Sequence, residues 1–361
     1  MLSTLPPIKG LSHYTLPLVE DLSKNCKIDF YGFKSLYPGF LYPGGTKTNE
    51  KEPKLENLKI INSLTWYNPF SWIKVGFSIK TKIVHAQWWS WILAPVYFGV
   101  LGIARLRGKK VIMTIHNVQP HERSIIKDIL NKSVLKLANE YIVHSESNKK
   151  LLSKKTNKRI NVISHGLIKI KESKREHKEL REKYSFTNED KILLFFGNIR
   201  DYKGLDILLK SISEIDKKNL KLIIAGKPWK SFEKYESLIS KLRLDKKIKL
   251  FLDFNPNKKV AELFKISDLV ILPYKNFEAS SGAGTVALNF KKPLIVTNVG
   301  GLPELVLDKK TIAQPNSPKS LKEKIIYGLS NLNKLKQDSE IKMEEFSQKN
   351  VSKKLMEVYN K

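Results

Sequence analysis

Apolar and polar positions along the chain form alternating blocks that indicate an α/β fold. Short uninterrupted apolar runs, typical of strands buried on both faces of a sheet, are separated by stretches with helical periodicity. A helix is expected from Ser12 to about Leu22. The strands expected in the first half are residues 2–5, 27–33, 59–61, 83–84, 111–114 and 141–144. This alternation predicts a parallel sheet with helices on both faces.

A second series of strands begins after residue 190. It comprises residues 192–196, 221–225, 248–252, 269–272 and 294–297. Between the two series, residues 167–190 are charged and lack a core pattern, as a linker would. A chain of 361 residues suits two domains of roughly 150–200 residues each. We therefore predict two Rossmann-like doubly wound domains facing a cleft, residues 1–166 and 191–337, joined by this linker.

One apolar segment is long enough to suggest a membrane span. Residues 83–104 carry no charge, and their second part approaches the length of a transmembrane helix. Pro95, Gly99 and Gly102 interrupt it, however, and His85 and Gln87 lie near its start. A strand followed by a buried helix is therefore the favoured interpretation.

The cysteine content, the first residues and the net charge limit the compartment and the partners that we expect. Cys26 is the single cysteine, so the chain has no internal disulfide and no cysteine metal site, which suits a reducing compartment. The first residues lack the basic and apolar regions of a signal peptide, so we expect a cytoplasmic protein. The net charge of +30 favours an anionic partner, which includes nucleic acid, an anionic membrane or a phosphorylated ligand. A solvated lysine-rich surface explains it equally well, and the even spread of charge disfavours nucleic acid.

Two turns at strand ends have the composition of phosphate-binding sites. After strand 269–272, a loop containing Ser281 and Gly282 opens a helix, whose free N–H groups can face an anion. After strand 192–196, Arg200 and Lys203 lie between a glycine turn and a helix start, where they can clamp a diphosphate. The alternatives are glycines that serve packing only and basic residues that merely decorate the surface.

These segments together resemble the retaining GT-B glycosyltransferases of family 4, the glycosyl transferases group 1. The resemblance is carried by the Arg-x-x-Lys-Gly turn at 200–204, Glu278, the Ser-Gly pair at 281–282 and the Gly-Gly-Leu-Pro-Glu loop at 300–304. The second glutamate of the family motif would fall at Val286, so this chain departs from the pattern there. The resemblance implies the GT-B fold and a C-terminal helix, within residues 338–361, that returns to the first domain.

The resemblance also implies roles for individual residues. His116, at the end of strand 111–114, and Glu278 would act at the donor sugar, although His116 can also be read as a satisfied core histidine. The donor diphosphate would be bound by Arg200, Lys203, Ser281, Gly282, Gly284, Thr285 and Gly10. Gly226 and Lys227 would lie near the nucleotide base, and His121 and Glu122 would serve the acceptor. His144 and His165 are expected to be hydrogen-bonded strand ends.

An aromatic and basic segment in the first half suggests a surface for lipids. Its aromatic members are Trp66, Phe70, Trp72, Trp88, Trp89 and Trp91. Its basic members are Arg105, Arg107, Lys109 and Lys110. Such a face suits an anionic membrane or a lipid-linked acceptor, and core packing of most of these tryptophans is the alternative.

The resemblance implies a retaining glycosyltransferase that moves a sugar from a UDP- or GDP-sugar to an acceptor hydroxyl, in polysaccharide or glycolipid assembly. No metal-binding motif is present, so we expect no metal and no cofactor besides the donor substrate. The expected partners are the nucleotide sugar, a carbohydrate or lipid-linked acceptor and the inner face of the membrane, without nucleic acid. Two alternatives remain open: a GT-B epimerase or phosphorylase, and a basic nucleic-acid- or membrane-binding protein with a vestigial site.

Overall fold

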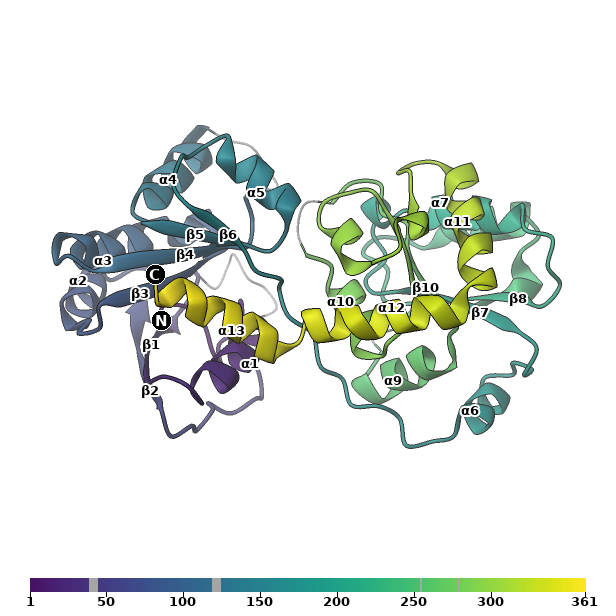
Figure 1. Cartoon of the computed structure of the whole chain (residues 1–361), viewed down its shortest axis with the longest axis horizontal. Coiled ribbons are helices and arrows are strands. Elements are labelled where there is room, and N and C mark those ends of the chain that lie inside the picture. Colours follow the sequence, from purple (N-terminus) through teal and green to yellow (C-terminus); the bar gives the residue numbers. More distant parts are fainter. Residues whose placement is uncertain (39–44, 119–124, 254, 278–279) are drawn as a thin grey trace. The chain divides into compact units, whose positions relative to one another are not determined.

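The computed structural model describes residues 1–38, 45–118, 125–253, 255–277 and 280–361. The chain forms two compact units, shown in Figure 1. The first contains Met1–Gly166 together with Gln348–Lys361, and the second contains Leu167–Ser347. Each unit is an α/β structure built on parallel strands, as the apolar runs predict.

The first unit contains two parallel sheets. The larger has the order β3 (Ile83–Trp88), β4 (Lys110–Ile115), β5 (Glu140–Val143) and β6 (Ile160–Val162). The smaller pairs β1 (Ile28–Ser35) with β2 (Leu58–Thr65). Leu2 bridges Tyr31 in β1 and Ala86 in β3 and so joins the two sheets. The strand expected at residues 2–5 is reduced to this bridge, because a turn at Pro6 and Pro7 follows directly.

Helices of the first unit pack against these sheets. They are α1 (Ser12–Leu22), α2 (Pro69–Ser78), α3 (Ala94–Leu106), α4 (Ile125–Lys136), α5 (Glu146–Ser153), α13 (Gln348–Tyr359) and the short 3₁₀ helix η2 (Trp91–Leu93). The uncharged stretch forms β3 and then α3, whose inward side chains are buried, as predicted. Within the described ranges, every helix is too short or too polar to cross a bilayer.

The second unit is built on one six-stranded parallel sheet. Its order is β12 (Ile312–Ala313), β11 (Leu294–Thr297), β10 (Leu269–Leu272), β7 (Lys191–Phe196), β8 (Leu220–Ala225) and β9 (Ile248–Phe251). All four residues of β10 and of β11 are buried, as expected for central strands covered on both faces. The strand β12 was not predicted, because a run of two residues carries too little apolar pattern. The strand β6 ends three residues before His165, which was expected at a strand end.

Helices cover both faces of the second sheet. The α-helices are α6 (His177–Lys183), α7 (Leu205–Ser213), α8 (Glu233–Lys241), α9 (Asn257–Ile266), α10 (Gly282–Asn289), α11 (Pro318–Ser330) and α12 (Leu332–Glu345). The 3₁₀ helices are η3 (Asp201–Lys203), η4 (Asp245–Lys247), η5 (Leu302–Leu305) and η6 (Lys309–Thr311).

The segment 167–190, expected as a free linker, is part of the second unit. Its helix α6 buries Leu180 completely in the core of that unit. Arg181 is also buried, donates to the carbonyl oxygens of Thr187 and Asp190, and pairs with Asp268 at 3.2 Å. The segment was misread because its buried residues, Leu180, Arg181, Tyr184 and Phe186, are scattered among charged residues and do not produce an apolar pattern.

The C-terminal segment divides between the two units. Phe346, just after α12, packs in the core of the second unit. The following helix α13 belongs to the first unit, where Val351, Leu355 and Val358 pack with Leu18 of α1. The boundary between the units thus lies close to residue 347 and not at residue 337.

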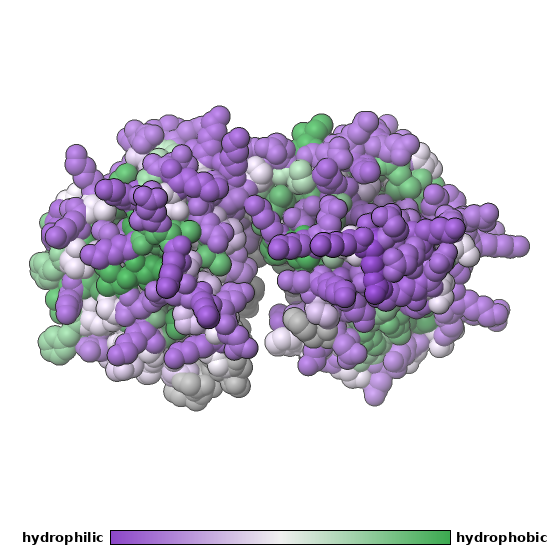
Figure 2. All heavy atoms as spheres, turned by 90° about the horizontal axis from the view of Figure 1, so that it is seen from below, coloured by the Kyte–Doolittle hydropathy of each residue, from purple (hydrophilic) through white to green (hydrophobic). Residues whose placement is uncertain are grey.

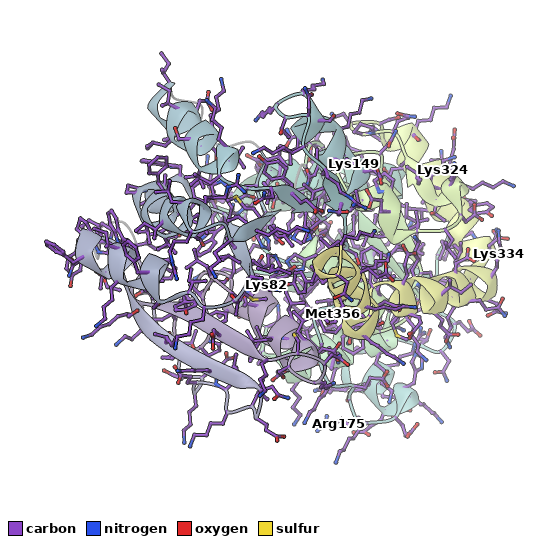
Figure 3. The ribbon with its side chains drawn as sticks, turned by 60° about the vertical axis from the view of Figure 1, so that its left-hand side comes forward. Lys82, Lys149, Arg175, Lys324, Lys334 and Met356 are labelled. Atoms are coloured by element: carbon purple, nitrogen blue, oxygen red, sulfur yellow. The ribbon has the colours of Figure 1, made fainter. Side chains whose placement is uncertain are left out.

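Lysines project from many elements of both units. Lys82 precedes β3, Lys149 lies in α5, and Lys324 and Lys334 lie in α11 and α12 (Figure 3). The positive charge is therefore distributed along the whole chain.

Candidate functional site

Two glycine turns at the carboxyl ends of β7 and β8 lie directly against each other. The N–H of Gly197 donates to the carbonyl oxygen of Ala225 at 2.9 Å, and Gly197 has a φ of 101°. A Cβ atom on Gly226 would lie 2.1 Å from the carbonyl oxygen of Gly197, so only glycine fits at Gly226. The predicted phosphate turn and the predicted base region are therefore one continuous surface at the edge of the sheet where ligands of such folds bind.

Lys203 is a buried cation at this edge. Its Nζ lies 2.7 Å from the position that a Cβ on Gly197 would occupy, so the absence of a side chain there makes room for the ammonium group. Burial lowers the pKa of Lys203 to about 8, and the nearby Arg200 adds to this effect. In the described ranges no carboxylate pairs with it, so within this part of the chain the Lys203 ammonium group is open to an added anion.

Arg200 is held by a tryptophan that sequence reasoning missed. Its guanidinium carbon lies 3.9 Å from the centre of the Trp229 ring, a cation–π contact. The two turns position this pair, because Trp229 N–H donates to Ile199 and Ile199 N–H donates to Lys227. The sequence signal that could have revealed Trp229 is an aromatic residue two positions after Lys227, because the turn that contains it pairs with the turn that contains Arg200.

The N-terminus of α10 supplies the second half of the site. Ser281 caps the helix, since its Oγ accepts from the N–H of Gly284 at 3.2 Å. The N–H of Thr285 donates to the carbonyl oxygen of Ser281 at 3.0 Å. Of the four predicted phosphate-binding amides, those of Gly284 and Thr285 are therefore already used by the helix. The amides of Ser281 and Gly282 have no partner in the described ranges.

Tyr274 joins the lysine to the helix. Its hydroxyl group lies 3.1 Å from Ser281 Oγ, and the Nζ of Lys203 lies 5.6 Å from the centre of its ring. A Cβ on Gly197 would also come within 3.9 Å of Ala283 in the first turn of α10. Gly197, Lys203, Tyr274 and Ser281 thus form one group, called here the Lys203 cluster. A cation beside an open helix N-terminus is an arrangement that binds phosphate.

The two positions of the family's glutamate motif in this chain are 278 and 286. Glu278 lies outside the described residues. Val286 is buried in the apolar core, so its side chain offers nothing to a ribose. Gly284 allows Leu305, which directly follows the loop at 300–304, to approach α10, because a Cβ at Gly284 would lie 2.3 Å from the Leu305 side chain. That loop therefore supports α10 through packing.

His116 of the first unit is buried and hydrogen-bonded through both ring nitrogens. Its Nδ1 lies 3.2 Å from Nε2 of His144, and its Nε2 lies 2.7 Å from the Gln87 side-chain amide. His144 Nδ1 donates to the carbonyl oxygen of Ile163 at 2.9 Å, which leaves its Nε2 as an acceptor. His116 is thus held by contacts at both ring nitrogens, Nδ1 against His144 and Nε2 against Gln87 Oε1.

Further histidines surround His116. The rings of His144 and His165 lie with centres 4.8 and 6.2 Å from it, and Tyr14 packs edge-on at 4.7 Å. Burial, with the neighbouring histidines, lowers the pKa of His116 and of His165 well below the usual value, and burial lowers that of His144 to about 4. These rings are neutral at pH 7. No group of three or more His, Cys, Asp or Glu side chains could hold a metal ion in the described part of the chain.

The remaining predicted site residues lie partly inside and partly outside the described ranges. His121 and Glu122 lie outside the described residues. Gly10 has a φ of 88° and precedes α1, and the N–H of Leu11 donates to Thr4 Oγ1 at 2.9 Å. Lys227 contributes its carbonyl oxygen to the turn that supports Arg200.

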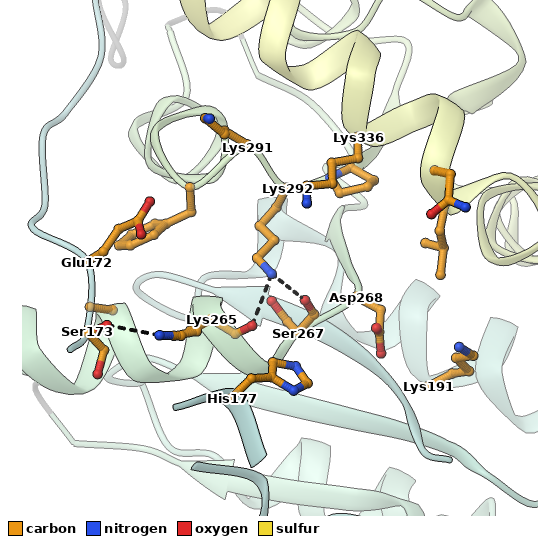
Figure 4. Close-up of a pocket in the computed structure, with 15 residues that line it drawn as sticks. Glu172, Ser173, His177, Lys191, Lys265, Ser267, Asp268, Lys291, Lys292 and Lys336 are labelled. Carbon is orange, nitrogen blue, oxygen red and sulfur yellow. Dashed lines mark hydrogen bonds between the residues drawn. The ribbon is translucent and has the colours of Figure 1, made fainter. Parts of the chain in front are cut away.

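A cavity of about 530 Å³ lies at the opposite edge of the second sheet, where the strands begin. Figure 4 shows Lys292 pointing into it, with Nζ donating to the carbonyl oxygens of Lys265 and Ser267. Lys265 in turn donates to Ser173. These bonds satisfy carbonyl groups at the end of α9, which is a structural role. Ligands of open α/β sheets bind at the other edge, so the Lys203 cluster is the candidate site in preference to this cavity.

Comparison with known proteins shows similarity to glycosyltransferases. Residues 176–344 match the family of glycosyl transferases group 1. An uncharacterised glycosyltransferase of Methanocaldococcus jannaschii is 36% identical over 145 residues, 38% of each chain. D-inositol 3-phosphate glycosyltransferase of Corynebacterium efficiens is 28% identical over 131 residues, 34% of this chain and 30% of that one. The matched segment thus spans less than two fifths of either relative.

The fold is shared over the whole chain. The structure of HepE from Anabaena in complex with UDP and glucose matches 99% of this chain and 98% of that one, with a TM-score of 0.70 at 15% identity. The match to the glycosyl transferases group 1 thus lies within the second unit, which holds the Lys203 cluster. The chain has the GT-B fold, as its sequence predicts.

Proposed function

We propose that this protein transfers a sugar from a nucleoside-diphosphate sugar to an acceptor hydroxyl, with retention and without a metal ion. The observation that carries the proposal is Lys203, a buried ammonium group with no carboxylate partner in the described ranges, beside the open N-terminus of α10. The family match of the same segment, and the UDP-bound structure that shares the fold, support a nucleotide sugar as donor.

Charge neutralisation is the main chemical contribution of the second unit. When the bond between the anomeric carbon and the phosphate oxygen breaks, the leaving diphosphate gains negative charge. Lys203, Arg200 and the amides of Ser281 and Gly282 stabilise that charge, which lowers the barrier without a metal. The acceptor oxygen forms the new bond on the same face of the sugar, and its proton passes to the departing phosphate.

Arg200 and Lys203 have complementary tasks in this scheme. Trp229 fixes the plane of the Arg200 guanidinium, so its paired N–H groups can meet two phosphate oxygens. Lys203 is a point charge in a dry position, where its attraction to phosphate is strong. Its own pKa of about 8 rises when an anion arrives, so the bound lysine is fully charged.

In this proposal Glu278 and His116 act at the donor sugar. Glu278 accepts hydrogen bonds from sugar hydroxyl groups. For His116 this role requires a change in its present bonds to His144 and Gln87. Gly10, Gly226 and Lys227 would approach the donor, and His121 and Glu122 would orient the acceptor.

We further infer a carbohydrate or lipid-linked acceptor in polysaccharide or glycolipid assembly, at the cytoplasmic face of the membrane. One relative of this chain is named a lipopolysaccharide 1,2-N-acetylglucosaminetransferase, which supports such an acceptor.

A panel of UDP- and GDP-sugars tests the proposal on the wild type, Arg200→Ala and Glu278→Ala. We expect thermal stabilisation by one nucleotide sugar, its loss in Arg200→Ala, and slower release of sugar in Glu278→Ala. Transfer of the sugar to an added acceptor alcohol distinguishes a transferase from an epimerase or a phosphorylase. Absence of any response to nucleotide sugars would refute the proposal.

A further inference from the structure

Helices α2 and α3 of the first unit present apolar side chains to solvent. The exposed large side chains on them and just before α2 are Tyr67, Phe70, Ile73, Phe77, Phe98 and Leu106. Phe70 and Leu106 are 80% and 89% exposed. Figure 2 shows apolar surface, in green, among the hydrophilic side chains of the left-hand unit. These six residues are called here the α2–α3 face.

The inner sides of the two helices pack against each other without these side chains. A Cβ on Gly76 of α2 would lie 2.8 Å from Ile103 of α3, and a Cβ on Gly99 of α3 would lie 3.1 Å from Trp72 of α2. The glycines thus bring the helices together. Phe70, Ile73 and Phe77, at helical spacing, form a separate outward stripe on α2.

The tryptophans expected to form a lipid-binding surface are not the exposed residues. Trp88 is buried and donates to Asn131 Oδ1 at 2.6 Å. Trp72 and Trp89 are half-buried and donate to Thr65 and Tyr37. Trp66 and Trp91 are also half-buried. Of the predicted aromatic set, Phe70 alone is exposed.

The charged residues of α2, α3 and the segments that adjoin them in sequence are all basic. No aspartate or glutamate occurs between residues 57 and 121. The basic residues in this interval are Lys59, Lys74, Lys80, Lys82, Arg105, Arg107, Lys109 and Lys110. Lys74, Lys80 and Arg105 are exposed near the apolar stripe or the helix ends. Arg107 donates to carbonyl groups at the end of α2 and lies 6.0 Å from the Phe77 ring, so it brings positive charge to the apolar edge.

We propose that the α2–α3 face binds the surface of an anionic lipid bilayer. The aromatic and aliphatic side chains enter the boundary between headgroups and acyl chains, while the surrounding lysines and arginines meet the lipid phosphates. A protein partner would be recognised through pairs of both signs, whereas α2, α3 and the segments that adjoin them in sequence offer only positive charge. The proposal rests on the membrane location inferred under the proposed function and names the surface that makes the contact. It does not depend on the Lys203 cluster, which lies in the other unit.

Vesicle flotation tests the proposal on the full chain. The probes are vesicles of phosphatidylcholine alone and of phosphatidylcholine with phosphatidylglycerol. The apolar variant is Phe70→Ser with Phe77→Ser, and the charge variant is Lys74→Glu with Lys80→Glu. The matched control is Ile326→Ser with Ile341→Ser, which removes two exposed apolar side chains from the second unit. Circular dichroism and the melting temperature establish that each variant is folded.

We expect the wild type and the control to float with anionic vesicles and not with neutral ones. The apolar variant should lose roughly tenfold or more of this partitioning, because two aromatic side chains no longer leave water. The charge variant should bind weakly and lose the salt dependence of the wild type. Equal binding to both vesicle types, or unchanged binding by the folded apolar variant, would overturn the proposal. A second result would also overturn it: a wild type that binds no vesicles but self-associates, with the apolar variant abolishing the self-association. The partner of the α2–α3 face would then be a second copy of the chain.

Discussion

The guanidinium group of Arg200 rests on the ring of Trp229, 3.9 Å from its centre, although the two residues lie in different turns of the second unit. The contact exists because the turns after β7 and β8 are joined by backbone hydrogen bonds. Trp229 is two thirds exposed, so it contributes little to the core. Its function in the proposed mechanism is to hold Arg200 toward the diphosphate.

Replacement of Trp229 should therefore weaken donor binding without unfolding the protein. We expect Trp229→Ala to raise the Kd for the nucleotide sugar several-fold, since an exposed cation–π contact contributes about 0.5–1 kcal/mol. Trp229→Phe keeps an aromatic face and should retain most of the affinity. Calorimetric titration measures both values, and equal affinity of the alanine variant and the wild type would show that Arg200 needs no support.

Replacement of Gly197 should damage the site more than it damages the fold. A Cβ at Gly197 would lie 2.7 Å from Lys203 Nζ, so Gly197→Ala must displace the ammonium group. Gly108→Ala is the matched control, because Gly108 also has a positive φ, of 73°, but has no atom within 4 Å of its Cβ position. Both variants should lose about 1 kcal/mol of stability from backbone strain. Only Gly197→Ala should lose nucleotide affinity, and equal affinity in the two variants would contradict the account.

The buried histidines should make the first unit sensitive to acid. His144 has a pKa of about 4 in the folded protein and about 6.5 when unfolded, so the unfolded chain binds its proton first as the pH falls. Stability contributed by this neutral ring is complete above pH 6.5 and declines between pH 6.5 and 4, by on the order of 3 kcal/mol. Urea unfolding across this range measures the decline. His144→Gln should reduce it, whereas His177→Gln in the second unit should leave the decline of the first unit unchanged.

Restoring the second glutamate of the family motif should fail. Val286 is buried among apolar side chains, so Val286→Glu places a carboxylate in the core at a cost of several kcal/mol. We expect a much lower melting temperature and no gain in donor affinity. Val286→Ala controls for lost volume and should cost less. A stable Val286→Glu protein with tighter nucleotide binding would show that position 286 can reach the ribose.

The strands and the first phosphate turn could be predicted because they depend on local sequence. Continuous apolar runs such as 269–272 specify buried strands, and glycines followed by Arg200 and Lys203 specify a turn that can hold an anion. Tyr274 and Trp229 could not be found in the same way. They join the site through contacts between strands that are far apart in the sequence, and an isolated aromatic residue usually indicates core packing.

The tryptophans of the first unit show a related limit. Sequence composition indicated an aromatic and basic segment, but it did not reveal which aromatic side chains point outward. That depends on how α2 packs against α3 at Gly76 and Gly99. The helix packing buries or half-buries the tryptophans and leaves the phenylalanines Phe70 and Phe77 in water.

The most direct test of the central claim is the affinity of Lys203→Met for UDP and GDP, compared with Lys210→Met on the exposed side of α7. If Lys203 is a buried cation held for a diphosphate, Lys203→Met should be at least as stable as the wild type, because a buried charge with no carboxylate partner in the described ranges has been removed. It should also bind the preferred nucleotide roughly a hundredfold more weakly, while Lys210→Met binds normally. Wild-type affinity in a folded Lys203→Met protein would contradict the account.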